Sequence, residues 1–92
     1  MGQLRYGSDL QVDLDDGLLG HIEAAAISKL RRGESFALRL DDAAGARTVW
    51  IGPASQLVFV YADGRPTIDR PWLEAIVESA NTPAGMRLIP QP

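Results

Sequence analysis

Apolar and polar residues alternate along several short stretches of this chain, and a period of two is typical of strands with one buried face. The predicted strands are residues 4–6, 10–14, 36–40, 47–51 and 57–61. Gly7-Ser8-Asp9 between the first two predicts a hairpin loop, and residues 41–46 predict a second loop. The run at residues 57–61 is apolar on both faces, so we place it in the centre of the sheet.

Two other stretches repeat their apolar residues every three to four positions, which is the period of an amphipathic helix. The first covers residues 16–32, where Asp15 and Asp16 suit the positive start of a helix and Gly33 suits its end. The second follows Asp69, the predicted N-cap, and ends at Asn81. Both helices present one apolar side, so each is expected to pack on a sheet.

The predicted order of elements is β-β-α-β-β-β-α-β, with a last strand at residues 86–89. Consecutive strands joined by short loops favour a mostly antiparallel sheet, and two one-sided helices would cover one face of it. A chain of 92 residues supports one modest core. We therefore expect a single α+β domain over residues 1–92, whose second sheet face is wet or used for association.

The composition excludes several kinds of covalent bond, metal site and catalytic site. The chain has no cysteine and one histidine, which excludes disulfides, cysteine zinc sites and sites that need two imidazoles. No apolar run reaches the length of a membrane helix and the first residues carry no leader pattern, so we expect a cytoplasmic protein without membrane contact. A net charge of −3 argues against broad, non-specific binding of nucleic acid.

The basic residues suggest a candidate anion or nucleic-acid site. Lys29, Arg31 and Arg32 lie near the end of the first predicted helix, and Arg39 lies on the strand that follows. Phosphate sites normally use a helix N-terminus, because a helix C-terminus repels anions. The alternative interpretation is that these cations complement the helix dipole and are solvated.

Tryptophan and arginine residues suggest a candidate interface, since both residue types are favoured as interface anchors. The candidates are Trp50, Arg65, Arg70 and Trp72. Trp50 lies in a predicted strand and needs burial somewhere. For Trp72 the alternative is a position in the core, and for Arg70 it is an ion pair with a neighbouring acidic residue.

No catalytic or metal constellation is found in the sequence. His21 lies beside an apolar helix stripe, and Glu23 two residues on faces elsewhere, so we expect a structural histidine. The acidic groups are Asp13, Asp15 and Asp16 before the first helix, and Asp41 and Asp42 in a predicted loop. Caps and turns explain these acids, and the glutamate that ends a calcium loop is missing because residue 24 is alanine. No catalytic residue, metal ligand or cofactor is predicted.

Several segments resemble a family of small uncharacterised actinobacterial proteins of about this length. They are Leu4-Arg5-Tyr6-Gly7-Ser8, Lys29-Leu30-Arg31-Arg32-Gly33-Glu34-Ser35-Phe36, Thr48-Val49-Trp50-Ile51, Asp69-Arg70-Pro71-Trp72-Leu73-Glu74-Ala75, Ser79-Ala80-Asn81 with Gly85, and Leu88-Ile89-Pro90. Members are often labelled as ATP-dependent DNA ligases, and such a ligase adenylates the lysine of a Lys-x-Asp-Gly motif. Here Lys29 is followed by Leu30, Arg31 and Arg32, so the resemblance implies no ligase chemistry.

Three functions remain open from the sequence. The favoured one is a non-catalytic protein-interaction or self-association module that uses an uncovered sheet face or edge strand. The alternative is a nucleic-acid-binding accessory protein linked to DNA repair, which would use a local arginine patch. The third is a small hydrolase or transferase that pairs His21 with an aspartate. No small-molecule ligand is predicted.

Overall fold

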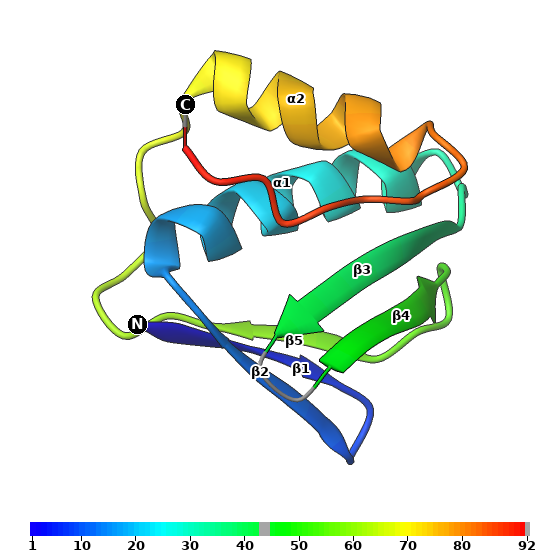
Figure 1. Ribbon diagram of the computed structural model, residues 1–92. Coiled ribbons are helices and arrows are strands. Elements are labelled where there is room, and N and C mark those ends of the chain that lie inside the picture. Colours follow the sequence, from blue (N-terminus) through cyan, green and yellow to red (C-terminus); the bar gives the residue numbers. More distant parts are fainter. Residues whose placement is uncertain (43–44, 92) are drawn as a thin grey trace.

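The chain forms strands and helices in the order that the polarity pattern predicts, apart from its last segment. The computed structural model describes residues 1–42 and 45–91. Its elements are β1 (Gly2–Tyr6), β2 (Leu10–Leu14), α1 (Asp16–Arg31), β3 (Phe36–Asp42), β4 (Gly45–Ile51), β5 (Leu57–Val60) and α2 (Arg70–Ala80). Figure 1 shows the helices together in a layer on one side of the strands. The predicted α+β class is confirmed.

The strands pair in two antiparallel sheets in the described part of the chain, so the prediction of one sheet is wrong. Their orders are β2-β1-β5 and β3-β4. The reason lies in the connection after β4. Residues 52–56 turn the chain toward β1, where the Gly7 amide donates a hydrogen bond of 2.9 Å to the Gln56 carbonyl. β5 therefore joins the first hairpin instead of pairing with β4.

β5 lies at the edge of its sheet, and the prediction that it occupies the centre is also wrong. Leu57 and Phe59 face the core and are half-buried, whereas Val58 and Val60 are 49% and 39% exposed. A run that is apolar on both faces is suited to a central strand. Whether both faces are covered depends on the elements that pack there, and none of the described elements covers Val58 and Val60 on the outer face of β5.

The predicted loop at residues 41–46 consists largely of strand. β3 continues to Asp42 and β4 begins at Gly45, and these two residues are register partners. Residues 43 and 44 of the predicted loop lie outside the described residues. The pairing of β3 with β4 continues beyond the residues whose polarity alternates. Its hydrogen bonds join backbone groups, and every residue of these strands carries such groups whatever its side chain.

The strand predicted at residues 86–89 is reduced to a single bridge in the described structure. The Met86 amide donates to the Ala37 carbonyl, and the Met86 carbonyl accepts from the Arg39 amide, both at 2.8 Å. Further along, the Ile89 carbonyl accepts a hydrogen bond of 2.7 Å from Nε1 of Trp72 on α2. This bond ties the tail to the helical layer, so the ladder along β3 does not continue.

Both helices begin and end close to the predicted residues. The Asp15 carboxylate caps α1 by accepting from the amides of Gly17 at 2.9 Å and Leu18 at 3.3 Å. Gly33 follows the end of α1 with a φ of 70°, the left-handed conformation that glycine adopts most readily. Asp69 precedes α2 as predicted, but its side chain makes no capping hydrogen bond.

The core lies between the helical layer and the strands. Its fully buried large side chains include Leu4 of β1, Leu19 and Ile22 of α1, Leu38 and Leu40 of β3, Ile51 of β4, Ile76 of α2, and Met86. The two helices run in the same direction, because His21 stacks on Trp72 near their starts and Lys29 bonds Asn81 near their ends. Among the described residues, no helix combines the length and apolar character needed to cross a membrane.

Gly20 is the point where α1 approaches the segment before α2 most closely. A Cβ on Gly20 would lie 2.3 Å from Cγ and 2.5 Å from Cδ of Pro66, which is far inside normal contact distance. The rigid proline ring has little freedom to move aside. Glycine at this position therefore sets the distance between α1 and residues 62–69.

We expect Gly20→Ala to lower the free energy of unfolding by about 1–3 kcal/mol, because overpacking outweighs the roughly 1 kcal/mol that alanine gains over glycine in a helix. Ser28→Ala, on the exposed side of α1, is the matched control and is expected to be neutral or slightly stabilising. Urea unfolding followed by circular dichroism measures both. Equal stability of Gly20→Ala and the wild type would contradict the close approach.

Candidate functional site

Lys29, the first of the predicted anion-binding residues, has a structural role. It is only 5% exposed, and its Nζ donates to Oε1 of Glu34 at 3.2 Å and to Oδ1 of Asn81. These bonds join α1 to the turn that follows it and to the end of α2. A cation that is buried and neutralised in this way is a poor ligand for an anion.

The three arginines of the predicted anion site do not share one environment. Arg31 and Arg32 are exposed at the end of α1, where Nε of Arg32 lies 3.3 Å from Oε2 of Glu34. Arg39 lies on the face of β3 opposite the buried Leu38 and Leu40, and its Nη1 reaches the Ala84 carbonyl at 3.4 Å. Only Arg31 and Arg32 remain at one exposed surface.

The four predicted interface residues also lie in different environments in the structure. Trp50 is 66% exposed on the outer face of β4, and its carbonyl accepts a hydrogen bond of 2.6 Å from the Tyr6 hydroxyl. Trp72 is 4% exposed and belongs to the core, as the alternative interpretation of the sequence held. Arg65 and Arg70 are both exposed, Arg65 beside α1 and Arg70 at the start of α2.

His21 connects the starts of the two helices. It is 1% exposed, its ring stacks on Trp72 with centroids 4.0 Å apart, and its Nε2 accepts from the Asp69 amide at 2.8 Å. Because a backbone amide can only donate, the proton must lie on Nδ1, which donates to the Gly17 carbonyl at 2.7 Å. Both ring nitrogens are therefore engaged with the backbone, and neither is free to serve as a general base.

A polar cluster that the sequence analysis missed surrounds Glu23. Its Oε1 accepts from the Tyr61 hydroxyl at 2.6 Å and lies 3.3 Å from Nε of Arg65. The Arg65 guanidinium also lies over the Tyr61 ring, 5.6 Å from its centroid. Burial and the hydrogen bond to Glu23 raise the pKa of the Tyr61 hydroxyl above its ordinary value. No local pattern signals this cluster, because Glu23 is about forty positions away in the sequence from Tyr61 and Arg65.

The acidic residues before α1 act on the backbone. Asp15 caps α1, and Asp16 accepts from the amides of Ala62 at 3.4 Å and Asp63 at 2.8 Å. These bonds fasten the start of α1 to the loop after β5. Among the described residues, no group of three or more histidine, aspartate or glutamate side chains is placed to hold a metal ion.

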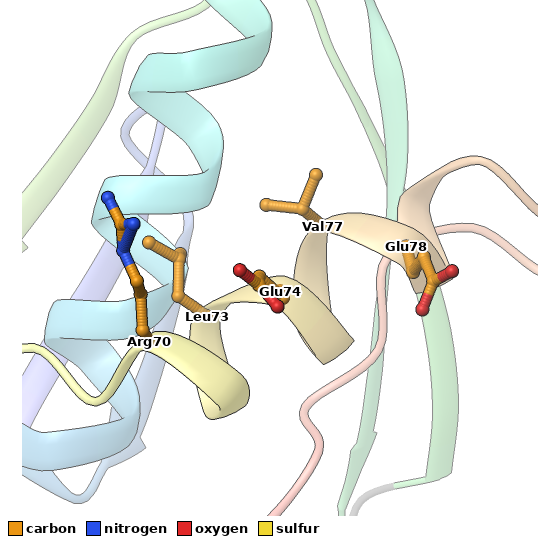
Figure 2. Close-up of a pocket in the computed structure, with 5 residues that line it drawn as sticks. All are labelled: Arg70, Leu73, Glu74, Val77 and Glu78. Carbon is orange, nitrogen blue, oxygen red and sulfur yellow. The ribbon is translucent and has the colours of Figure 1, made fainter.

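The surface of the helical layer carries shallow grooves. One runs along α2 and is lined by Arg70, Leu73, Glu74, Val77 and Glu78, which Figure 2 shows along one side of that helix. Two others share Ala24 and Ile27 and follow the exposed side of α1. One of the α1 grooves extends toward Pro66 and Ile68, and the other toward Arg31.

The fold and these surfaces define a small α+β domain with two parallel helices over antiparallel strands. The chain belongs to the family described as a domain of unknown function, DUF7882, whose model matches residues 1–91. Neither the curated proteins nor the solved structures include a match to this chain. The resemblance to a small uncharacterised family is confirmed in this form.

We expect His21→Ala to lower the free energy of unfolding by about 2–4 kcal/mol, because it removes two hydrogen bonds and leaves a cavity beside Trp72. His21→Phe keeps an aromatic ring there and should lose less. Urea unfolding of both variants separates the polar from the packing contribution. A loss below about 0.5 kcal/mol for His21→Ala, the range of ordinary surface changes, would contradict a structural role.

We expect the folded state to lose stability as the pH rises above about 10, the ordinary pKa of tyrosine. The pKa of Tyr61 is raised in the folded state, so the unfolded state loses this proton first and is favoured at high pH. The contribution is fully present below pH 10. Urea unfolding between pH 8 and pH 11, about two units below and one unit above that ordinary pKa, measures the decline.

The matched variants for this pH dependence are Tyr61→Phe and Tyr6→Phe. Tyr61→Phe removes the titrating hydroxyl and should flatten the decline, after a loss of about 1 kcal/mol at neutral pH for the bond to Glu23. Tyr6→Phe retains Tyr61 and should retain the decline. The same slope in wild type and Tyr61→Phe would show that another group causes it.

Proposed function

We propose that this domain is a non-catalytic protein-interaction module that binds an extended segment of another protein along β5. The observation that carries the proposal is the outer edge of β5, which pairs with no other strand of residues 1–42 and 45–91 and presents Val58 and Val60 to solvent. An exposed edge strand is a template for pairing with another chain, and natural sheets usually protect such edges with charge, proline or a cover. β5 contains neither proline nor a charged residue.

The backbone of β5 offers hydrogen-bonding groups at this edge. In an antiparallel ladder, bonded and non-bonded residue pairs alternate along the strands. The hydrogen bond from the Gly7 amide to the Gln56 carbonyl makes these two residues a bonded pair. Every second pair along the ladder is then also bonded, so the backbone groups of Val58 and Val60 bond to β1. The amides and carbonyls of Leu57 and Phe59 therefore point away from β1, toward the free edge.

The other strand edges are less suited to an apolar partner. On β2, the exposed residues of the outer face are Gln11 and Asp13, which are polar. On β4, the carbonyl of Trp50 already accepts the Tyr6 hydroxyl. β5 combines a free backbone with apolar side chains, so it is the edge that supports the proposal best.

A segment added to this edge would gain affinity from main-chain hydrogen bonds and specificity from its alternating side chains. On the outer face its side chains would contact Val58 and Val60. On the inner face they would approach the half-buried Leu57 and Phe59. The partner segment is therefore expected to be extended and rich in β-branched and aromatic residues.

The alternative, a nucleic-acid-binding accessory protein without ligase chemistry, has narrower support. Its basis is the exposed pair Arg31 and Arg32 beside a shallow groove. Arg32 is paired with Glu34, Lys29 is buried, and the net charge is −3. Phosphate binding relies on several uncompensated cations at one surface, so we rank this function second.

Selection from a displayed library of random peptides on the immobilised domain tests the proposal. The enriched peptides should alternate apolar residues, and a synthetic copy should slow hydrogen exchange at the amides of Leu57 and Phe59. Val58→Lys should weaken this peptide about tenfold or more, because an edge lysine discourages strand pairing. Absence of any enriched sequence, or unchanged binding by Val58→Lys, would overturn the proposal.

Gln11→Lys is the matched control for this experiment. It makes the same change of charge on the outer face of β2, at the opposite edge of the same sheet. Its affinity for the selected peptide should equal that of the wild type. A loss in both variants would point to general repulsion and would count against docking at β5.

A further inference from the structure

The edge of β5 that faces away from β1 is self-complementary in its backbone groups. The amides and carbonyls of Leu57 and Phe59 point toward this edge, whereas those of Val58 bond to β1. Leu57 and Phe59 lie at equal distances along the strand from Val58, one on each side. A second copy of β5 that runs antiparallel and is centred on Val58 therefore places its Phe59 opposite Leu57 and its Leu57 opposite Phe59. Each of these pairs can exchange both of its backbone hydrogen bonds.

The side chains of β5 also match in this register. On the outer face, Val58, which is 49% exposed, meets Val58 of the second copy across the axis. On the inner face, the half-buried Leu57 meets Phe59 of the second copy. Apolar neighbours on adjacent strands stabilise a sheet. The same strand therefore offers matching side chains on both of its faces.

The charges around β5 favour the antiparallel direction. Neither β5 nor residues 52–56 before it carry a charged side chain. The nearest acidic group after β5 is Asp63, which is exposed and whose amide donates to Oδ2 of Asp16 at 2.8 Å. Antiparallel pairing brings Asp63 of each copy toward the neutral residues 52–56 of the other. Parallel pairing would place Asp63 beside its own copy, and like charges placed side by side are unfavourable.

The length of β5 sets the strength of such a contact. Its four residues extend about 14 Å, which is about half of the 30 Å length of the molecule. One strand edge of this length buries less than the roughly 800 Å² per partner of a stable interface. Gln56 and Ala62, on either side of β5, are exposed, so the described chain leaves both ends of the edge accessible. The contact therefore suits a weak and reversible dimer.

From these observations we propose that the β5 edge pairs with the β5 edge of a second copy of the chain, and that this pairing masks the edge when no partner segment is bound. A two-fold axis perpendicular to the sheet joins two three-stranded sheets into one, in the order β2-β1-β5-β5-β1-β2. The dimer depends on the edge alone, whereas its regulatory role rests on the proposed function. A partner segment competes for the same backbone groups of Leu57 and Phe59, so its binding separates the two copies.

Sedimentation equilibrium from about 10 μM to about 1 mM protein, a range that covers weak complexes, tests the pairing. The average mass of the wild type should rise with concentration from 10.0 kDa toward twice that value. Hydrogen exchange at the amides of Leu57 and Phe59 should slow over the same range. Wild-type protein that stays monomeric up to the highest concentration would overturn the proposal.

Charge exchange at Val58 tests the register. Val58→Lys and Val58→Asp each place like charges opposite one another at the axis, so each should raise the dimer dissociation constant about tenfold or more. An equimolar mixture of the two variants sets lysine opposite aspartate and should form a mixed dimer at least as readily as the wild type dimerises. A mixture that remains monomeric would overturn this register. Circular dichroism checks that both variants fold, as expected for substitutions at an exposed position.

Gln11→Lys, at the opposite edge of the same sheet, is the matched control and should dimerise like the wild type. The selected peptide, added to the wild-type dimer, should return the mass to that of a monomer with one peptide. A peptide that binds without separating the copies would overturn the shared edge. A monomeric protein that binds the peptide would overturn self-pairing alone, and a dimer for which no peptide is enriched would overturn the proposed function alone.

Discussion

The burial of α1 is the constraint on which the rest of this structure depends. Leu19, Ile22, Ala25 and Ala26 are almost completely inaccessible, because strands lie on one side of the helix and α2 lies beside it. A chain of this size has one core, and α1 runs through it. Each neighbouring element must therefore approach α1 closely, and Gly20 permits the closest of these approaches, to Pro66.

Polar contacts fix how the neighbouring segments meet α1. Asp16 holds the loop after β5, His21 holds the residue before α2, and Lys29 holds the end of α2. Each of these side chains is a residue type that often performs chemistry elsewhere. Here their polar atoms bond the backbone or neighbouring side chains, so the same groups connect the elements of the fold. This use of the titratable residues explains why the surfaces, rather than a pocket, carry the functional proposals.

The proposed binding surface is the edge of a sheet, and recognition at this edge rests on backbone groups. The β5 edge offers unpaired backbone groups, which recognise an extended chain through hydrogen bonds. Because the helices cover one side of the strands and β5 lies at a sheet edge, the helical layer and this edge lie on different parts of the molecule.

The sequence by itself determined the local elements, because the periods of two and 3.6 and the capping residues act over a few neighbouring positions. It placed α1 and α2 within a residue or two, but it left Trp72 open between an interface and the core, where the structure places it. It did not determine that the strands form two sheets, that β5 lies at an edge, or that Glu23, Tyr61 and Arg65 meet. Those features depend on which distant segments pack together. Only the tertiary structure decided them, since backbone pairing and charge contacts between distant residues leave no periodic signal in the chain.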